Sequence, residues 1–154
     1  RGDKLAQCET IYKLGLLAYN QGHYDQVLPI VEPGWEIAFA EEYGRWLYNI
    51  TWLLGLAFQQ QGQIGACNYF GLAILLTLQY NNQEKYAEFV DELTDSLQQL
   101  LLAGEVESAL AFCQQLLQQL QDEGWQEWSA PAIAHFNLVY ATLQANAIEA
   151  SRSA

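Results

Sequence analysis

The sequence is poor in basic side chains and in proline, and each shortage excludes a class of protein. Six lysine and arginine residues stand against 18 aspartate and glutamate residues in a chain of 154, so the formal net charge is −12. This charge repels phosphate groups, and we therefore expect neither nucleic-acid binding nor docking on anionic lipid. Only three prolines occur, while 51% of the residues are hydrophobic and 16% are charged. That composition excludes a collagen-like or disordered chain and suits one compact domain or a short repeat array.

The cysteines are also few, and their spacing argues against disulfide bonds and against a zinc site. Cys8, Cys67 and Cys113 lie far apart in the sequence, with no Cys-x-x-Cys pair and no neighbouring cluster of histidines. A disulfide framework or a zinc site requires paired spacing. We expect reduced thiols that act as small apolar side chains, which is consistent with a cytoplasmic location.

Long uninterrupted apolar runs are missing as well. Residues 46–83 carry no charge, but several glutamines, Gly62 and Asn68 interrupt the stretch. Neither half reaches the ~20 consecutive apolar residues that a membrane-spanning helix needs. No segment combines the basic start, apolar core and small-residue cleavage site of a signal peptide. The stretch therefore predicts two buried helices around a polar turn, and we expect no membrane partner.

Helical periodicity is present throughout. Alanine, leucine, glutamine and glutamate dominate, and no alternating run bounded by Asn-Gly or Asp-Gly turns indicates a strand. The pattern predicts an all-α protein with helices at residues 4–21, 23–43, 45–61, 63–82, 84–103, 105–123 and 126–146. Within 23–43, Pro29 and Pro33 leave two alternatives, a kinked helix or a broken one, because proline removes a backbone donor and clashes with the preceding turn.

The helices recur with a nearly fixed period. Gly22, Gly62 and Gly104 each end a helical run, at spacings of 40 and 42 residues. The runs 14–19 and 54–59 align without a gap, and this continuous register favours the kinked form of the second helix. Such a period predicts stacked helical hairpins, because one hairpin cannot bury its own apolar face.

Two glycines lie inside predicted helices rather than at their ends. A glycine in a helix interior costs ~1 kcal/mol relative to alanine. Gly15 and Gly55 occupy the same position of the first two units. We expect each where the two helices of a pair approach closely, so that a larger side chain would force them apart.

The aligned units share a set of residues that resembles a known repeat. The matching positions are Leu14, Gly15, Ala18, Gly22, Tyr24 and Val27, then Leu54, Gly55, Phe58, Gly62, Ile64 and Cys67, and finally Gly104, Val106 and Ala109. This pattern resembles the tetratricopeptide repeat family, in its longer form of the kinesin-light-chain type. It departs from the family at Ile11 and Thr51, which stand where the family has an aromatic residue, and at Leu97 in place of a glycine.

The resemblance implies an α-α superhelix, or solenoid, built as a single domain over residues 4–146. It would comprise about three helical hairpins, at residues 4–43, 45–82 and 84–123, and a C-terminal capping helix at 126–146. The first helix of each pair would line a concave face. Some family members grip a terminal carboxylate there with basic side chains. This chain has Tyr12, Leu16, Leu53, Asp91 and Asp95 at those positions, so we expect no binding of that type.

Helical phase selects the side chains of this predicted groove. They come from the first, third and fifth helices: Glu9, Tyr12, Leu16, Tyr19, Asn20, Asn49, Trp52, Leu53, Leu56, Gln59, Gln60, Asp91, Thr94, Asp95, Gln98 and Leu102. One interpretation is capture of an extended or helical peptide, with aromatic anchors, amides that bond the peptide backbone, and carboxylates that meet a basic residue. The other is that Tyr12, Leu16, Trp52 and Leu56 pack helix against helix. An error of one residue in the helical phase would exchange the groove-facing side chains with those that pack between helices.

The sequence therefore predicts a non-enzymatic scaffold that binds a basic or neutral segment of a partner protein and needs no cofactor. The main alternative is self-association, in which the array or its last helix packs on a second copy. A third alternative uses Asp91 and Asp95, whose i, i+4 spacing would let them share a proton or hold a metal ion. No Glu-x-x-His motif accompanies them.

Overall fold

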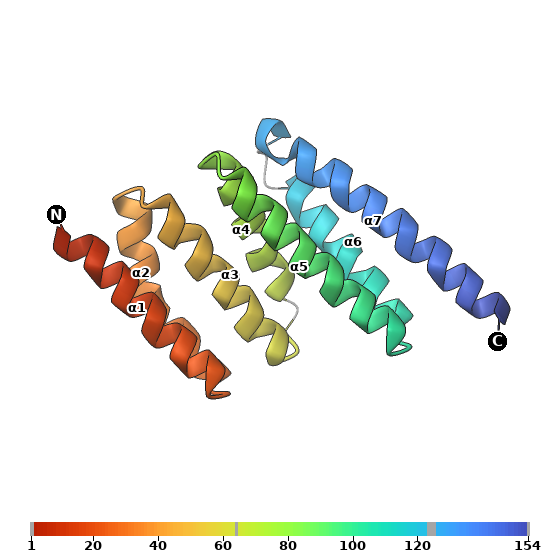
Figure 1. The fold of residues 1–154 in the computed structure, drawn as a ribbon, viewed down its shortest axis with the longest axis horizontal. Coiled ribbons are helices and arrows are strands. Elements are labelled where there is room, and N and C mark those ends of the chain that lie inside the picture. The colour runs from red at the N-terminus through yellow and green to blue at the C-terminus, as the bar shows by residue number, and fades with distance from the viewer. Residues whose placement is uncertain (1, 64, 123–125, 154) are drawn as a thin grey trace. The chain divides into compact units, whose positions relative to one another are not determined.

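The computed structural model describes residues 2–63, 65–122 and 126–153, and these ranges are almost entirely helical (Figure 1). The elements are α1 (Gly2–Asn20), the short 3-10 helix η1 (Tyr24–Gln26), α2 (Val27–Ala40), α3 (Gly44–Gln60), α4 (Ala66–Gln79), α5 (Gln83–Leu102), α6 (Val106–Asp122) and α7 (Gln126–Ser153). No strand occurs in the described ranges. The all-α class with seven α-helices is confirmed, while the solenoid arrangement stays a prediction.

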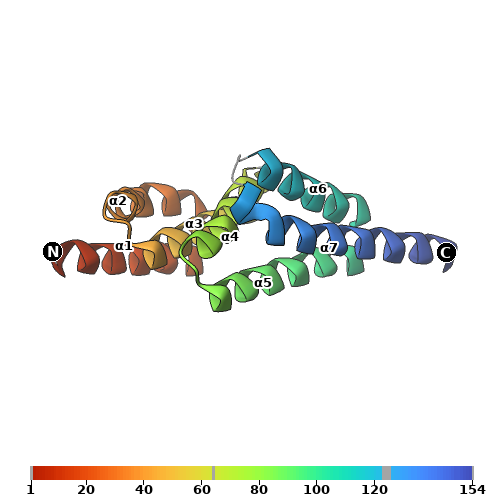
Figure 2. The same cartoon turned by 90° about the horizontal axis from the view of Figure 1, so that it is seen from above.

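The chain divides into two compact units, residues 1–80 and 81–154. In unit 1, α1 pairs with α2 and α3 pairs with α4, and both α1 and α2 also pack on α3. Because α3 has neighbours on three sides, most of its side chains are buried. In unit 2, α7 packs on both α5 and α6 (Figure 2). The predicted single domain over residues 4–146 stays a prediction.

The two interior glycines lie where helices approach closely, as predicted. A Cβ atom built on Gly15 of α1 would collide with the Val31 side chain of α2. A Cβ atom on Gly55 of α3 would lie 2.6 Å from the ring of Phe70 in α4. The glycines thus set the spacing within the α1–α2 and α3–α4 pairs.

The three helix-ending glycines share one geometry. Gly22, Gly62 and Gly104 have φ values of 80°, 69° and 84°, in the left-handed region that glycine adopts without a Cβ penalty. At the first of these, the Gly22 N–H donates to Tyr19 O at 3.0 Å and the His23 N–H donates to Ala18 O at 2.9 Å. The same pair of bonds recurs at Gly62 and at Gly104. Each pair of hydrogen bonds satisfies two backbone carbonyls that the helix end would otherwise leave unpaired.

The second helix is not broken at either proline. Helix α2 runs from Val27 to Ala40 with Pro33 inside it. Pro29 occupies the third position, where a helical N–H has no partner within the helix in any case. The predicted range 23–43 is nevertheless too long, because η1 forms a separate turn before α2 and the helix ends at Ala40.

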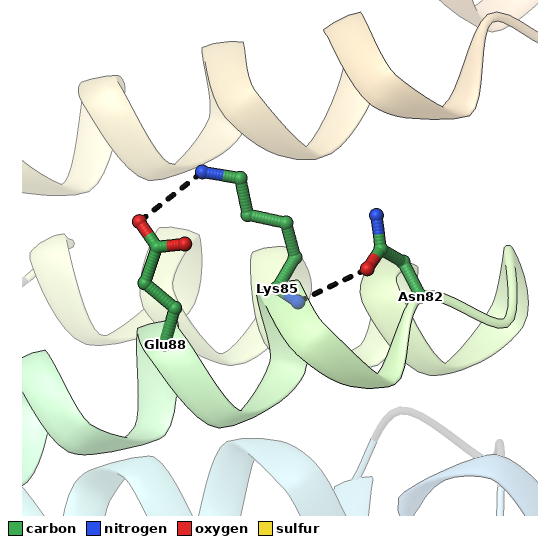
Figure 3. A network of polar contacts seen from close by, with 3 residues as sticks. All are labelled: Asn82, Lys85 and Glu88. Carbon is green, nitrogen blue, oxygen red and sulfur yellow. Dashed lines mark hydrogen bonds and ion pairs between the residues drawn. The ribbon is translucent and has the colours of Figure 1, made fainter.

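Other predicted boundaries also need correction. Helix α4 begins at Ala66 and ends at Gln79, well inside the predicted 63–82, and α7 extends to Ser153 rather than to residue 146. The repeat residue Ile64 and predicted helix residue 123 lie outside the described residues. Helix α5 begins at Gln83, one residue before the predicted start, because Asn82 caps it. The Asn82 Oδ1 atom accepts the Lys85 N–H at 3.0 Å (Figure 3).

Candidate functional site

The first part of the predicted groove lies on α1 in unit 1. Tyr12, Leu16 and Tyr19 are half-buried and follow one another at helical spacing, so they form one stripe. Glu9 is exposed at one end of the stripe and pairs with Lys13 at 3.1 Å, and Asn20 is exposed at the other end. The stripe is therefore mainly aromatic and aliphatic, with polar side chains at both ends.

The stripe on α1 meets α3 through polar and aromatic contacts. The side chains of Tyr19 and Gln60 are hydrogen-bonded to each other. Burial raises the pKa of Tyr19, while the bond with Gln60 acts in the opposite direction. The ring of Tyr19 also lies 5.3 Å from that of Tyr24, measured between centroids. Two residues selected by helical phase alone are thus brought together.

At the other end of the stripe, a cation that was not predicted lies beside the groove residues. The ring of Tyr12 lies 5.6 Å from that of Trp46, and the guanidinium of Arg45 lies 4.9 Å from the Trp46 centroid. Arg45 stands four residues before Asn49, at helical spacing with it. Arg45 could therefore have been predicted from the sequence, because the helical phase that selected Asn49 also selects Arg45.

Two of the predicted groove residues on α3 belong to the core instead. Trp52 is 7% exposed and Leu53 is 1% exposed, and the Trp52 ring packs 4.6 Å from that of Phe70. The packing interpretation holds for Trp52, and Leu53 is buried as well, because α1, α2 and α4 pack on α3. Leu56, Asn49 and Gln59 are half-buried and Gln60 is exposed. The remaining α3 contribution is thus one aliphatic side chain and three amides.

The predicted acidic residues lie on α5 in unit 2. Asp91, Asp95 and Gln98 are exposed and Leu102 is 81% exposed, so α5 offers both carboxylates to solvent. Thr94 is half-buried, and its hydroxyl donates to Val90 O at 2.8 Å. These residues belong to the second unit, whereas the stripe of Tyr12, Leu16 and Tyr19 belongs to the first.

The candidate binding face consists of the half-buried groove residues of α1 and α3, together with Gln60, which bonds to Tyr19. We define it by seven residues of unit 1: Tyr12, Leu16, Tyr19, Asn49, Leu56, Gln59 and Gln60. Four carry apolar or aromatic groups and three carry neutral amides. Such a surface can bury apolar side chains and at the same time bond a peptide backbone.

Several exposed apolar residues were not predicted. Leu14 and Leu17 of α1 are 51% and 53% exposed. The repeat pattern treats Leu14 as the equivalent of Leu54, which is buried. In the described part of unit 1, α3 packs on three α-helices and α1 on two, so α1 leaves more of its surface exposed. Periodicity alone cannot distinguish the two environments.

The described residues hold no metal-binding cluster of three or more histidine, cysteine, aspartate or glutamate side chains. The three cysteines are free and buried, as predicted. Burial raises the pKa of the Cys113 thiol to about 11, which keeps it protonated and unreactive. Among the helices in the described ranges, none is long and apolar enough to cross a bilayer.

The chain was compared with models of protein families, with curated proteins and with solved structures, and none of the three comparisons gives a match.

Proposed function

We propose that this chain is a non-enzymatic, tetratricopeptide-like interaction module that binds a peptide or helical segment of a partner protein on the candidate binding face. The observation that carries the proposal is the half-buried stripe of Tyr12, Leu16 and Tyr19 beside the amides of α3. Aromatic side chains that are held in place yet accessible are efficient anchors for a partner. Uncharged amides satisfy a peptide backbone without a large desolvation penalty.

The charge of the chain defines the partner further. With a net charge of −12, the protein attracts basic segments and repels acidic ones. The exposed carboxylates of Asp91 and Asp95 on α5 supply negative charge at adjacent turns of one helix. A basic or neutral partner segment therefore suits this protein, and an acidic one does not.

The test is affinity capture from a lysate of the source organism with three forms of the chain. The face variant is Tyr12→Ser combined with Leu16→Ser. The control is Leu138→Ser combined with Tyr140→Ser, an accessible leucine–tyrosine pair on α7 outside the face. Loss of two anchors weakens binding more than about tenfold. A protein retained by the wild type and the control but lost by the face variant supports the proposal, and retention of the same proteins by all three forms contradicts it.

Self-association is a second candidate, because α1 exposes Leu14 and Leu17. The same helix also lines a shallow hollow of about 410 Å³ whose walls include Ala6, Thr10 and Ile11. A second copy packed on α1 would remove these apolar groups from water. Light scattering at low and high concentration tests this candidate. A dimer that Leu14→Glu with Leu17→Glu dissociates supports it, whereas a monomer at high concentration rejects it.

A further inference from the structure

A second cavity in unit 1 lies outside the candidate binding face. It has a volume of about 230 Å³ and is lined by Leu28, Glu32, Trp35, Leu54, Tyr69 and Leu72. These residues come from α2, α3 and α4, whereas the candidate binding face comes from α1 and α3. Three leucines give the cavity an aliphatic lining, and two aromatic side chains and the exposed Glu32 complete it. No part of the proposed function uses this cavity.

The aromatic groups of the cavity are held in fixed orientations. The Trp35 indole N–H donates to Thr51 Oγ1 at 3.0 Å, and this hydroxyl donates to Leu47 O at 2.6 Å. The Tyr69 ring packs edge-on against Phe58 with 4.9 Å between centroids. Both rings are thus fixed by residues of α3. A ligand in the cavity would meet preorganised aromatic surfaces and would not have to order them.

Among the described residues that line the cavity, Glu32 is the one charged side chain, and its charge is negative. Helices α2 and α4 contain no lysine or arginine, and the single basic residue of α3 is Arg45, whose guanidinium lies over Trp46. Within the described part of the chain, no ion pair joins Glu32 to a basic side chain. Glu32 also acts on Tyr69, whose pKa is raised by burial and by this carboxylate. The phenol therefore stays neutral.

We infer that this cavity binds the side chain of a lysine from a partner polypeptide. The aliphatic lining suits the four methylene groups of lysine, which would leave water on binding. The ammonium group would lie near the Glu32 carboxylate and the aromatic rings, and both attract a cation. Glu32 would repel a ligand that carries a carboxylate. A purely apolar ligand would make no favourable interaction with the charge of Glu32. The site is separate from the candidate binding face, so either proposal can fail alone.

The first experiment compares small probes by the NMR shift of the Trp35 indole N–H, assigned with Trp35→Phe. The probes are n-butylammonium, which matches the lysine side chain, the neutral 1-butanol and the anionic butyrate. We expect n-butylammonium to bind most tightly and butyrate not to bind. Equal affinity for n-butylammonium and 1-butanol would overturn the inference, because the cavity would then be a simple apolar hollow.

The second experiment separates the carboxylate of Glu32 from the general charge of the chain. Glu32→Gln should weaken n-butylammonium binding roughly three- to fivefold, the size expected for a solvent-exposed ion pair. Glu36→Gln is the matched control, since Glu36 is exposed one turn later on α2 and does not line the cavity. Both variants remove one charge from an exposed position. An equal effect of the two substitutions would overturn the assignment to Glu32.

The third experiment tests the source of the ammonium group. The N-acetyl, N′-methylamide derivative of lysine presents the side chain as a polypeptide does. It should shift the same indole resonance as n-butylammonium, and the matching glutamine derivative should not. If only the free amine binds, the cavity takes a small amine and the assignment to a partner lysine is wrong.

Discussion

At the scale of single residues, glycines in this chain perform two separate tasks that substitution can distinguish. Gly22 has a φ of 80° and nothing within 4 Å of an added Cβ atom. Gly22→Ala should therefore lower the free energy of unfolding by about 1–2 kcal/mol through backbone strain alone. Gly55→Ala instead places a Cβ atom 2.6 Å from the Phe70 ring. We expect an overpacking cost of about 1–3 kcal/mol, reduced by the better helix propensity of alanine.

A double-mutant cycle in urea distinguishes the two causes. Phe70→Leu makes room next to Gly55, so Gly55→Ala should cost less in that background. The same background should leave the cost of Gly22→Ala unchanged, because no side chain is near Gly22. If Phe70→Leu rescues neither substitution, close packing is not the reason for the glycine at position 55.

Because the Cys113 thiol is buried, we expect the protein to lose stability in alkaline solution. Burial raises its pKa from 9.0 to about 11, so the folded state retains the proton over a range in which the unfolded state loses it. The free energy of unfolding should therefore fall as the pH rises from about 9 to about 11. The pKa of Tyr19 and of Tyr86 is also raised by burial, and both add to the fall.

Urea unfolding at a series of pH values checks this prediction with Cys113→Ala. The variant is less stable near neutral pH because it leaves a small cavity. Its stability should decline less steeply than that of the wild type across the alkaline range. Parallel curves for the two proteins would show that the thiol does not titrate as its burial requires.

At the scale of helices, the start of α5 depends on one polar side chain. Asn82 Oδ1 accepts the Lys85 N–H at 3.0 Å, and the Lys85 ammonium pairs with Glu88 at 3.2 Å (Figure 3). Asn82→Ala should cost about 1 kcal/mol, whereas Asn82→Gly should cost only a few tenths. Amide exchange in the first turn of α5 should accelerate with the alanine variant. Equal effects of alanine and glycine would contradict a capping role.

The sequence predicted the helices better than their boundaries. The ends at Gly22, Gly62 and Gly104 were predictable because glycine is the usual residue in the left-handed position after a helix. Asn81 and Glu42 adopt the same conformation, each with a φ of 56°. Asparagine is enriched in this left-handed conformation, so Asn81 is consistent with a helix end there. Glutamate is not enriched in it, so nothing in the sequence indicated this conformation at Glu42. The start of α2 was also missed, because η1 precedes it without any breaking residue.

The candidate binding face could be predicted only where one side of a helix is buried. On α1, helical phase selected Tyr19, whose side chain is hydrogen-bonded to the selected Gln60 of α3. On α3 the same reasoning selected Trp52 and Leu53, which are buried because three helices surround α3. The cavity at Glu32 and Tyr69 was not predicted at all, since it depends on how α2, α3 and α4 meet rather than on the pattern within one helix.

At the scale of the whole molecule, charge is the property that acts on a partner before contact. A net charge of −12 accelerates the approach of a basic segment, and added salt screens this attraction. The association rate of a captured basic partner should therefore fall as the salt concentration rises, while the dissociation rate changes little. Surface plasmon resonance at several salt concentrations measures both rates.

Two variants of equal net charge decide whether α5 contributes locally to this attraction. Asp91→Asn with Asp95→Asn removes two exposed carboxylates from α5, and Glu105→Gln with Glu107→Gln removes two exposed carboxylates elsewhere in unit 2. If the α5 carboxylates meet the partner, the first variant should lower the association rate and its salt dependence more than the second, because the field of a charge decays within about 10 Å at moderate salt. Identical rates for the two variants would mean that only the total charge of the chain matters and that α5 lies outside the site.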